Sequence, residues 1–506
     1  MDPRRIEIMD TTLRDGEQTS GVSFTAPEKL TLARLLLEEL KVDRIEVASA
    51  RVSEGEFESV RQITNWAKDA ELLSQVEVLS FVDQGASLDW IQKAGAVTQN
   101  LLTKGSMNHL THQLRKTPEV HFGEVADSLK QAADLQIQSN VYLEDWSNGM
   151  RNSRSYVMEF LDFLQTQPLR RILLPDTLGV LTPEESRSFL GEIVTRYPAL
   201  HIDFHGHNDY DLSVANVLEA VRAGVHGLHL TVNGMGERAG NAPLASVVAV
   251  INDFLPEVEI GIKEAALYKV SKLVSAFTGI GIPANKPIVG DNVFTQTAGI
   301  HADGDNKKNL YFNDLMPERF GRKRRYALGK TSGKANIQKN LQDLGLSLSD
   351  TELKQVTARI IELGDKKEKV TREDLPYIIS DVLGSGTSQR QVFIQSYVLT
   401  HAKGLQPTTT VAVEIAGKTY EENARGDGQF DAFMNALRKI YQTLKKPLPD
   451  LTDYAVRIPP GSNSDALCET VITWDDGDRE FTTRGLDSDQ TVSAIKATEK
   501  MLNICA

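Results

Sequence analysis

The stretch that indicates the fold reads LHIDFHGHND and covers residues 200–209. Its first half, Leu200–Phe204, alternates apolar and polar side chains, which is typical of a short β-strand. The polar residues that follow lie where that strand would end. A helical pattern over Ser213–Ala223 comes next, with Ser213 as a candidate cap and Gly224 as its stop. Strand, polar turn and helix together form one unit of an α/β protein.

The same unit recurs from the N-terminus to about residue 250. Short runs rich in strand-forming residues alternate with segments of helical periodicity such as Ala26–Leu40. Eight alternations of this kind predict a (β/α)8 TIM barrel, whereas a doubly wound open sheet usually has fewer strands, and no G-x-G-x-x-G follows the first run. The expected strands are Arg5–Asp10, Arg44–Ala48, Val76–Val82, Gln99–Thr103, Ser139–Glu144, Arg171–Asp176, Leu200–Phe204 and Gly227–Val232.

Composition and charge exclude several classes of partner. The chain has 506 residues, 41% hydrophobic and 25% charged, and a formal net charge of −13. Such a length predicts more than one domain. The acidic balance argues against nucleic acid or an anionic membrane as a partner, and we find no apolar run of membrane-span length. The two cysteines, Cys468 and Cys505, lack metal or redox spacing, so we expect a cytoplasmic protein.

Polar residues gather at the carboxyl ends of the expected strands. In a TIM barrel the active site forms at these ends, from residues that exit several different strands. Chance would distribute such residues over both ends of the barrel, so the pattern favours a functional site. The residues are Thr12–Glu17, Glu46, Ser49, Tyr142, Glu144, Asp176, Thr177, His205, His207 and Asn233.

His205 and His207 form an H-x-H pair that could bind a metal. In an extended segment their side chains point to the same side, and imidazole suits zinc, manganese or iron, although most such pairs are ordinary surface histidines. The glycine-rich loop NGMGERAGN, residues 233–241, could bring Asn241 near a ligand, or be only a flexible turn. With Asp15, these residues would form a mixed nitrogen and oxygen site. That donor set favours a borderline or hard divalent ion with open positions.

Three segments carry a resemblance to a known family. They are DTTLRDGEQ at residues 10–18, HGHN at residues 205–208 and GERAGN at residues 236–241. Together they resemble the 2-isopropylmalate synthase, homocitrate synthase and citramalate synthase family, whose members condense acetyl-CoA with a 2-oxo acid. The resemblance covers essentially the whole chain. It implies a TIM barrel with one divalent metal (Zn, Mn or Mg), bound by Asp15, His205, His207 and Asn241.

The resemblance also implies catalytic residues. Arg14, next to a metal ligand, would stabilise the alkoxide that forms with the new carbon–carbon bond. Thr177 would bind the substrate carboxylate, and Glu144 would remove a proton from the methyl group of acetyl-CoA. In the family, a histidine of the linker motif, here His301, reaches the active site of the partner subunit, and a tyrosine matching Tyr311 contributes there. We therefore expect a homodimer.

The same resemblance implies three parts of the chain. They are a catalytic barrel over residues 1–280, helical linker subdomains over residues 281–388, and a C-terminal α+β regulatory domain over residues 389–506. The stretches Gly426–Leu437 and Gly485–Ile495 read alike, which suggests an internal duplication. In the family this domain binds the end-product amino acid at a dimer interface. The candidates for that effector site, for which core and turn roles are the alternative, are Phe430, Asp431, Tyr454 and Gln490.

The expected pocket suggests which 2-oxo acid is the substrate. Leu79 and Leu102, at the ends of the third and fourth strands, would form a small apolar cup with Tyr142. Pyruvate needs room only for a methyl group, and crowding would exclude the isopropyl group of 2-oxoisovalerate. The segments NLLTKGS at residues 100–106 and VYLEDWSNG at residues 141–149 also resemble the citramalate synthase branch. We expect pyruvate with isoleucine as effector, and the alternative is 2-oxoisovalerate with leucine as effector.

Two other classes of function are weighed against this one. A related barrel could cleave its substrate, as 3-hydroxy-3-methylglutaryl-CoA lyase does, but such lyases depend on a cysteine that this barrel lacks. A non-catalytic sensor would be expected to have lost some of Arg14, Asp15 and Glu144, and all three are present. The condensing enzyme remains the favoured hypothesis.

Overall fold

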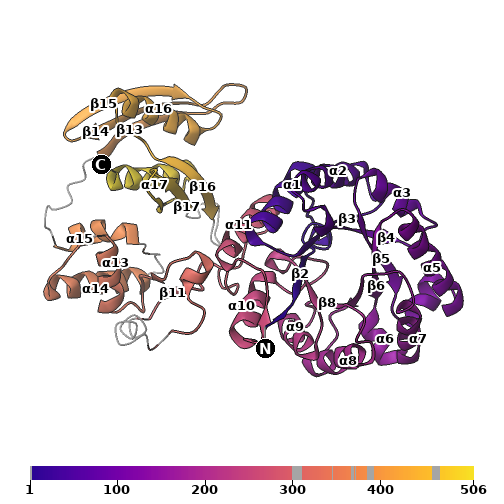
Figure 1. Ribbon diagram of the computed structural model, residues 1–506. Helices are drawn as coiled ribbons and strands as arrows, with labels where there is room; N and C mark the ends of the chain where they lie inside the picture. The colour runs from indigo at the N-terminus through magenta and orange to yellow at the C-terminus, as the bar shows by residue number, and fades with distance from the viewer. Residues whose placement is uncertain are drawn as a thin grey trace. The chain divides into compact units, whose positions relative to one another are not determined.

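A computed structural model describes most of the chain, and the chain divides into two compact units. The first unit comprises Met1–Thr295 and Phe312–Arg324, and the second comprises Gln296–Tyr311 and Arg325–Ala506. Each is described by itself below (Figure 1). The described residues are 3–298, 310, 312–344, 346–365, 370, 372–383, 392–457 and 468–505.

The first unit is a closed barrel of parallel strands surrounded by helices (Figure 1). Neighbouring strands pair in sequence order, and the last strand closes onto the first. The predicted TIM barrel is thereby confirmed. Its strands are β2 (Glu7–Asp10), β3 (Arg44–Ser49), β4 (Val76–Phe81), β5 (Thr98–Lys104), β6 (Gln138–Glu144), β7 (Arg171–Asp176), β8 (Ile202–Gly206) and β9 (Gly227–Leu230).

Helices follow the strands and cover the outside of the barrel (Figure 1). Their apolar faces join the outward-facing strand residues in one large core. The longer helices are α1 (Ala26–Arg34), α2 (Glu54–Asp69), α3 (Ala86–Lys93), α5 (Pro118–Asp134), α6 (Trp146–Asn152), α7 (Arg154–Leu164), α8 (Pro183–Arg196), α9 (Ser213–Ala223), α10 (Leu244–Phe254) and α11 (Leu267–Thr278).

Local differences from the expected elements have physical causes. The expected first strand is divided at Ile6: β1 (Arg4–Arg5) pairs with β10 (Val258–Glu259), and only β2 belongs to the barrel. Ser213 is the first residue of α9 rather than its cap. Its backbone N–H donates to Oδ1 of Asn208 at 3.1 Å, so the residue five positions earlier satisfies this helix end.

The barrel interior is layered, because strand residues alternate between the helices and the barrel axis. Val141 and Leu143 pack against the helices, whereas Tyr142 between them points inward. One inward layer is apolar and consists of Met9, Leu79, Leu102, Tyr142 and Leu173. Polar and charged side chains lie on either side of this layer. Some lie towards the amino-terminal ends of the strands, here called the base of the barrel, and others towards the carboxyl ends, here called the mouth.

The second unit begins with a helical part. Its helices α13 (Lys334–Asp343), α14 (Asp350–Asp365) and α15 (Leu375–Leu383) share a small apolar core. The short strands β11 (Thr295–Gln296) and β12 (Arg325–Tyr326) form a two-stranded sheet. A helical region follows the barrel in the sequence, as predicted.

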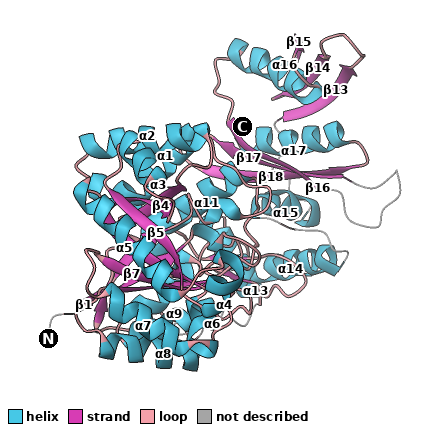
Figure 2. Ribbon diagram, turned by 90° about the vertical axis from the view of Figure 1, so that its right-hand side faces the viewer, coloured by secondary structure: helices cyan, strands magenta, loops and turns pink. Residues whose placement is uncertain are grey.

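The C-terminal part contains one topology twice. Three antiparallel strands are followed by a helix in each half, and the two halves share one core (Figure 2). The α+β prediction is confirmed, and the repeated topology supports the suggested duplication. The first half contains β13 (Val392–Thr400), β14 (Thr408–Ile415), β15 (Lys418–Arg425) and α16 (Gln429–Thr443); the second contains β16 (Asp450–Arg457), β17 (Cys468–Asp475), β18 (Glu480–Asp487) and α17 (Gln490–Ile504).

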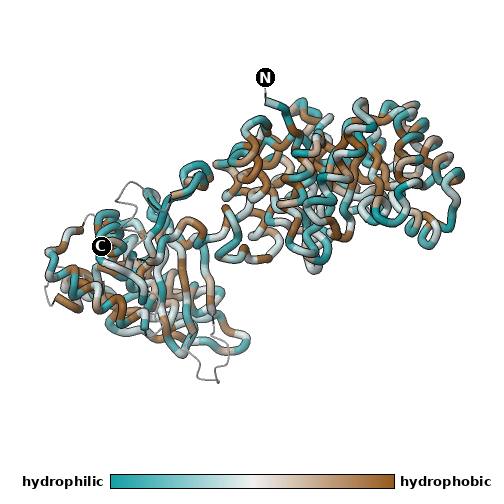
Figure 3. Tube along the Cα trace, turned by 90° about the horizontal axis from the view of Figure 1, so that it is seen from below, coloured by the Kyte–Doolittle hydropathy of each residue, from teal (hydrophilic) through white to brown (hydrophobic). Residues whose placement is uncertain are grey.

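Hydrophobic and hydrophilic residues alternate along the chain in both units, as expected where helices and strands each bury one face (Figure 3). None of the described helices combines the length and the apolar character needed to cross a membrane.

Candidate active site

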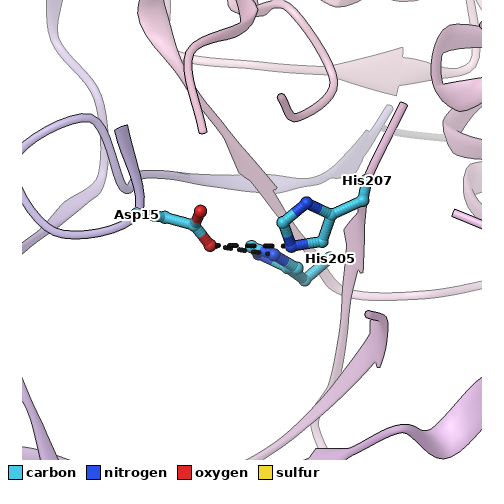
Figure 4. A group of neighbouring side chains, drawn as sticks. All are labelled: Asp15, His205 and His207. Atoms are coloured by element: carbon cyan, nitrogen blue, oxygen red, sulfur yellow. Dashed lines mark ion pairs between the residues drawn. The ribbon is translucent and has the colours of Figure 1, made fainter. Parts of the chain in front are cut away.

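Three predicted metal ligands converge at the mouth of the barrel (Figure 4). Asp15 follows β2, His205 lies on β8 and His207 comes directly after β8. Oδ2 of Asp15 is 3.3 Å from Nε2 of His205 and 3.8 Å from Nε2 of His207. All three side chains are buried, and their ligand atoms lie within 4.8 Å of one another. This geometry suits a bound cation.

The fourth predicted ligand, Asn241, lies beside the same carboxylate. Its Nδ2 donates to Oδ1 of Asp15 at 3.0 Å and to the carbonyl oxygen of Met235 at 3.0 Å. Its Oδ1 is buried and has no hydrogen-bond partner among the described residues. A buried carbonyl oxygen without a donor is costly, and a metal ion would satisfy it. The donor set therefore fits a divalent cation.

The glycine-rich loop before Asn241 is shaped by close contacts. Gly236 has a φ of 149°, and a Cβ atom there would lie 2.2 Å from Nδ2 of Asn241 and 3.2 Å from Oδ1 of Asp15. Only glycine allows the backbone to approach so closely. The loop is also tied to β8, because the N–H of Asn208 donates to the carbonyl oxygen of Gly240 at 2.9 Å. The loop is thus fitted to the ligand group.

The charges of the group suit metal binding. Burial alone would raise the pKa of the Asp15 carboxyl, but Arg14, His205 and His207 hold it well below its usual range. Burial also lowers the pKa of His207 to about 4. At neutral pH the carboxylate is therefore ionised and the His207 ring is neutral, which are the states that coordinate metals.

Arg14 is held rigidly beside the ligands. Its Nη1 is 3.0 Å from Oδ2 of Asp15, and its Nε is 2.5 Å from Oε2 of Glu46. Glu46 is fully buried, and its Oε1 accepts a hydrogen bond from Nδ2 of Asn100 at 2.7 Å. Asn100 in turn accepts one from Asn140 at 2.8 Å. This chain fixes the position of the guanidinium, so its charge is preorganised.

A second chain of contacts leads from Arg14 to the base of the barrel. Nη2 of Arg14 lies 3.4 Å from the hydroxyl of Tyr142, which is 2.9 Å from Nδ1 of His229. Nε2 of His229 lies 3.2 Å from Oδ2 of Asp203. Burial lowers the pKa of His229 to about 3, so the ring is neutral at pH 7. Its Nε2–H then donates to Asp203, and its Nδ1 accepts a hydrogen bond from the Tyr142 hydroxyl.

The three residues predicted to form a substrate cup all belong to the apolar layer. Leu79, Leu102 and Tyr142 pack together there, with Met9 and Leu173 in addition. The Tyr142 ring meets the His205 ring edge-on, with the centroids 6.1 Å apart. The apolar layer therefore lies directly beside His205, and it contains two more side chains than the three predicted residues.

Glu144 and Thr177 occupy other strand ends at the mouth. Glu144 forms an ion pair with Lys104. Oγ1 of Thr177 accepts a hydrogen bond from the N–H of Asp145 at 2.9 Å, which leaves its own proton to donate. The carbonyl oxygen of Thr177 accepts one from Arg238 at 2.7 Å. No contact joins either residue to the Asp15–His205–His207 group within the described chain.

Sequence reasoning missed Lys104 and His229. Both lie on the inward face of a barrel strand, so the alternation of β5 and β9 was the signal that could have found them. Predicted His301 and Tyr311 lie outside the described residues.

The predicted effector residues lie near one another in the second unit. One of them, Asp431, also stabilises a turn. The rings of Phe430 and Tyr454 are 5.4 Å apart, and the Tyr454 hydroxyl hydrogen-bonds the side chain of Gln490. Oδ2 of Asp431 accepts from the N–H of Asp427 at 3.0 Å, at the start of α16. Asp431 therefore organises this turn.

Models of three protein families together match most of the chain. Residues 5–274 match the HMGL-like model, residues 288–368 the homocitrate synthase post-HMGL domain-like model, and residues 369–506 the LeuA allosteric (dimerisation) domain. An (R)-citramalate synthase of Methanocaldococcus jannaschii is 34% identical over 502 residues, 99% of either chain. The chain belongs to the family of 2-isopropylmalate and citramalate synthases.

Both activities of this family occur among its relatives. A probable 2-isopropylmalate synthase of Methanopyrus kandleri is 35% identical over 503 residues, which are 99% of this chain and 98% of that protein. A 2-isopropylmalate synthase of M. jannaschii is 32% identical over 507 residues, which are 99% of this chain and 95% of that one. The chain is thus an acyltransferase of the class that condenses acetyl-CoA with a 2-oxo acid.

Proposed function

We propose that this protein condenses acetyl-CoA with pyruvate to form (R)-citramalate and CoA, a reaction that supplies isoleucine biosynthesis. The observation that carries the proposal is the crowded apolar layer beside the metal ligands, in which Leu79, Leu102 and Tyr142 are joined by Met9 and Leu173. A methyl group is the smallest side chain that a 2-oxo acid of this class presents. Condensation with 2-oxoisovalerate, which gives 2-isopropylmalate, is the second candidate, since relatives of both kinds are equally similar.

Asp15, His205, His207 and Asn241 would hold the divalent metal, Zn, Mn or Mg. When bound, this ion supplies a Lewis acid that polarises the keto group of the 2-oxo acid. The unsatisfied Oδ1 of Asn241 and the ionised Asp15 support this assignment.

The chain's own residues would perform the remaining steps. Arg14, fixed by Glu46, presents its charge where the alkoxide develops, and a preorganised donor of this kind is worth about 3–4 kcal/mol. Thr177 donates its free proton to the substrate carboxylate. Glu144 removes a proton from the methyl group of acetyl-CoA, and His301 of the linker assists it. Water then hydrolyses the thioester and releases CoA.

The matched dimerisation domain supports a homodimer with allosteric regulation. We place His301 and Tyr311 of one subunit at the active site of the other. Isoleucine is the proposed effector, bound near Phe430, Asp431, Tyr454 and Gln490. We further propose that the catalytic barrel ends at residue 280 and the linker part at residue 388. We also propose that the protein is cytoplasmic and has no nucleic-acid or membrane partner.

The test is CoA thiol release by the purified, metal-loaded protein with four 2-oxo acids in parallel. These are pyruvate, 2-oxobutyrate, 2-oxoisovalerate and 2-oxoglutarate, each with acetyl-CoA. We expect the highest kcat/KM with pyruvate. A preference for 2-oxoisovalerate would replace the proposal by its second candidate, and no CoA release with any of them would overturn both.

A further inference from the structure

At the mouth of the barrel, the buried Lys104 forms an ion pair with the partly buried Glu144, the proposed base. The two residues lie directly opposite each other on the neighbouring strands β5 and β6. Nζ of Lys104 contacts Oε2 of Glu144, and the side chains are 8% and 24% exposed. None of the roles proposed above requires this lysine.

The pair stands above the substrate cup. Lys104 and Glu144 are each two residues beyond a residue of the apolar layer, namely Leu102 and Tyr142. Side chains two positions apart on a strand point the same way, about 6.5–7 Å from each other along it. The ion pair therefore faces the barrel axis one step nearer to solvent, where a second substrate would approach the cup.

The backbone of Lys104 is fixed by buried groups. Its N–H is 3.3 Å from Nε2 of His121, and its carbonyl oxygen accepts a hydrogen bond from the Tyr156 hydroxyl at 2.7 Å. Burial lowers the pKa of His121 to about 4, so this ring is neutral and can accept. At the next residue, Gly105, a Cβ atom would lie 2.4 Å from the carbonyl oxygen of Leu143. The ammonium group is thus presented from a rigid strand end.

Proton removal by Glu144 changes the charges around this lysine. In the resting pair one positive charge faces one negative charge. When the carboxylate accepts a proton it becomes neutral, and the buried ammonium would lose its partner, which is unfavourable. At the same moment the electron pair of the broken C–H bond forms a C=C bond, and the carbonyl π pair moves onto the thioester oxygen, which gives an enolate. If that oxygen lies within reach of Lys104, one ion pair replaces another.

We propose that Lys104 is a catalytic residue that stabilises the enolate of acetyl-CoA. Its ammonium donates a hydrogen bond to the thioester carbonyl oxygen. The methyl C–H bond breaks, the proton goes to Glu144, the electron pair forms the C=C bond, and the carbonyl π pair moves onto the oxygen beside Lys104. When the enolate carbon attacks the keto carbon, the thioester C=O bond forms again. This inference rests on the proposed function.

The test compares variants of Lys104 in the full-length, metal-loaded enzyme. Lys104→Met removes the charge, and we expect kcat to fall about 100- to 1,000-fold, the usual loss of one preorganised donor. The primary isotope effect with methyl-deuterated acetyl-CoA should rise, because proton removal becomes slower. Metal content and the KM for the 2-oxo acid should stay within twofold. Lys104→Arg, which keeps the charge, should recover part of kcat.

A matched control comes from the surface pair of Lys116 and Glu124, whose Nζ and Oε2 atoms are 2.5 Å apart. Lys116→Met should leave rate and isotope effect unchanged. Suppose that the wild-type protein releases CoA. If Lys104→Met is then equally fast, or is slower without a larger isotope effect, the inference about Lys104 fails, while the proposed function stands. If Lys104→Met does not fold, a Lys104→Arg enzyme without residual activity overturns the inference. Wild-type protein inactive with every 2-oxo acid overturns both.

Discussion

The barrel interior contains two buried groups that each pair an aspartate with an arginine. Among the described residues, only the group at the mouth also brings the ligand atoms of its aspartate and two histidines within 4.8 Å of one another. At the base, Arg44 contacts Glu77 at 3.0 Å and Glu7 at 3.2 Å, and it also pairs with Asp203. The chain thus supplies the cation that its carboxylates need. At the mouth, Oδ2 of Asp15 is contacted by Nη1 of Arg14 at 3.0 Å, and the Nε2 atoms of His205 and His207 turn towards the same oxygen (Figure 4).

This difference shows that residue types alone do not define a metal site. Each group contains a buried aspartate in contact with a buried histidine and with an arginine, namely Asp203, His229 and Arg44 at the base and Asp15, His205 and Arg14 at the mouth. What distinguishes the mouth group is that the ligand atoms of Asp15, His205 and His207 lie within 4.8 Å of one another. An ionised carboxylate and neutral imidazole nitrogens that converge in this way are a donor set that suits a divalent metal. Arg14, Tyr142 and His229 connect the two groups through hydrogen bonds.

The largest expected effect is at the mouth. Asp15→Asn removes the anionic ligand, and we expect CoA release to fall at least about 1,000-fold because the Lewis acid is lost. As a control, Asp162→Asn, which affects the outer-face pair with Arg196, should keep full activity. An Asp15→Asn enzyme that retains near-normal turnover would remove Asp15 from the ligand set.

At the base we expect a loss of stability. Arg44→Met leaves Glu77 and Asp203 buried without their cation, and breaking such a pair costs about 3–5 kcal/mol of unfolding free energy. Urea unfolding monitored by circular dichroism measures this. The exposed pair of Arg61 and Glu58 gives the comparison, and Arg61→Met should be indistinguishable from wild type. Equal stability of the Arg44 variant would contradict a structural role for the base group.

A smaller effect is expected in the pH dependence of stability. The folded-state pKa of His229 is depressed to about 3, so between pH 6.5 and 4 the unfolded chain binds a proton that the folded chain does not. Stability must therefore fall as pH falls through this window. His229→Phe should make the fall shallower in chelator-treated protein, as measured by urea midpoints. His112→Phe, at an exposed position, should reproduce the wild-type slope. An unchanged slope in the His229 variant would show that the ring titrates when folded.

The smallest expected effect concerns substrate choice. Leu102→Ala enlarges the cup, and we expect the ratio of kcat/KM for 2-oxoisovalerate to that for pyruvate to rise about 10-fold. Leu101→Ala on the same strand faces the helices, so it should lower stability without changing this ratio. If both variants shift the ratio equally, the apolar layer does not set specificity.

The sequence predicted the barrel and the mouth group because both leave local patterns. Strand–helix alternation predicted the closed sheet, and the H-x-H spacing places His205 and His207 on one side of a strand. The base group left no such pattern. Arg44, Glu77 and Asp203 come from three strands, and their meeting depends on the closure and stagger of the barrel. Lys104 was hidden for the same reason, since its partner Glu144 is forty positions away.

The most direct test of the difference between the mouth group and the base group is the metal content of the purified protein, measured by plasma emission spectrometry. Wild type should hold one divalent ion per subunit. His207→Ala, at the mouth, should hold almost none, whereas His229→Ala, an equally inward histidine towards the base, should keep one. Retention of metal by the His207 variant together with its loss from the His229 variant would contradict the account, because it would place the ion at the base.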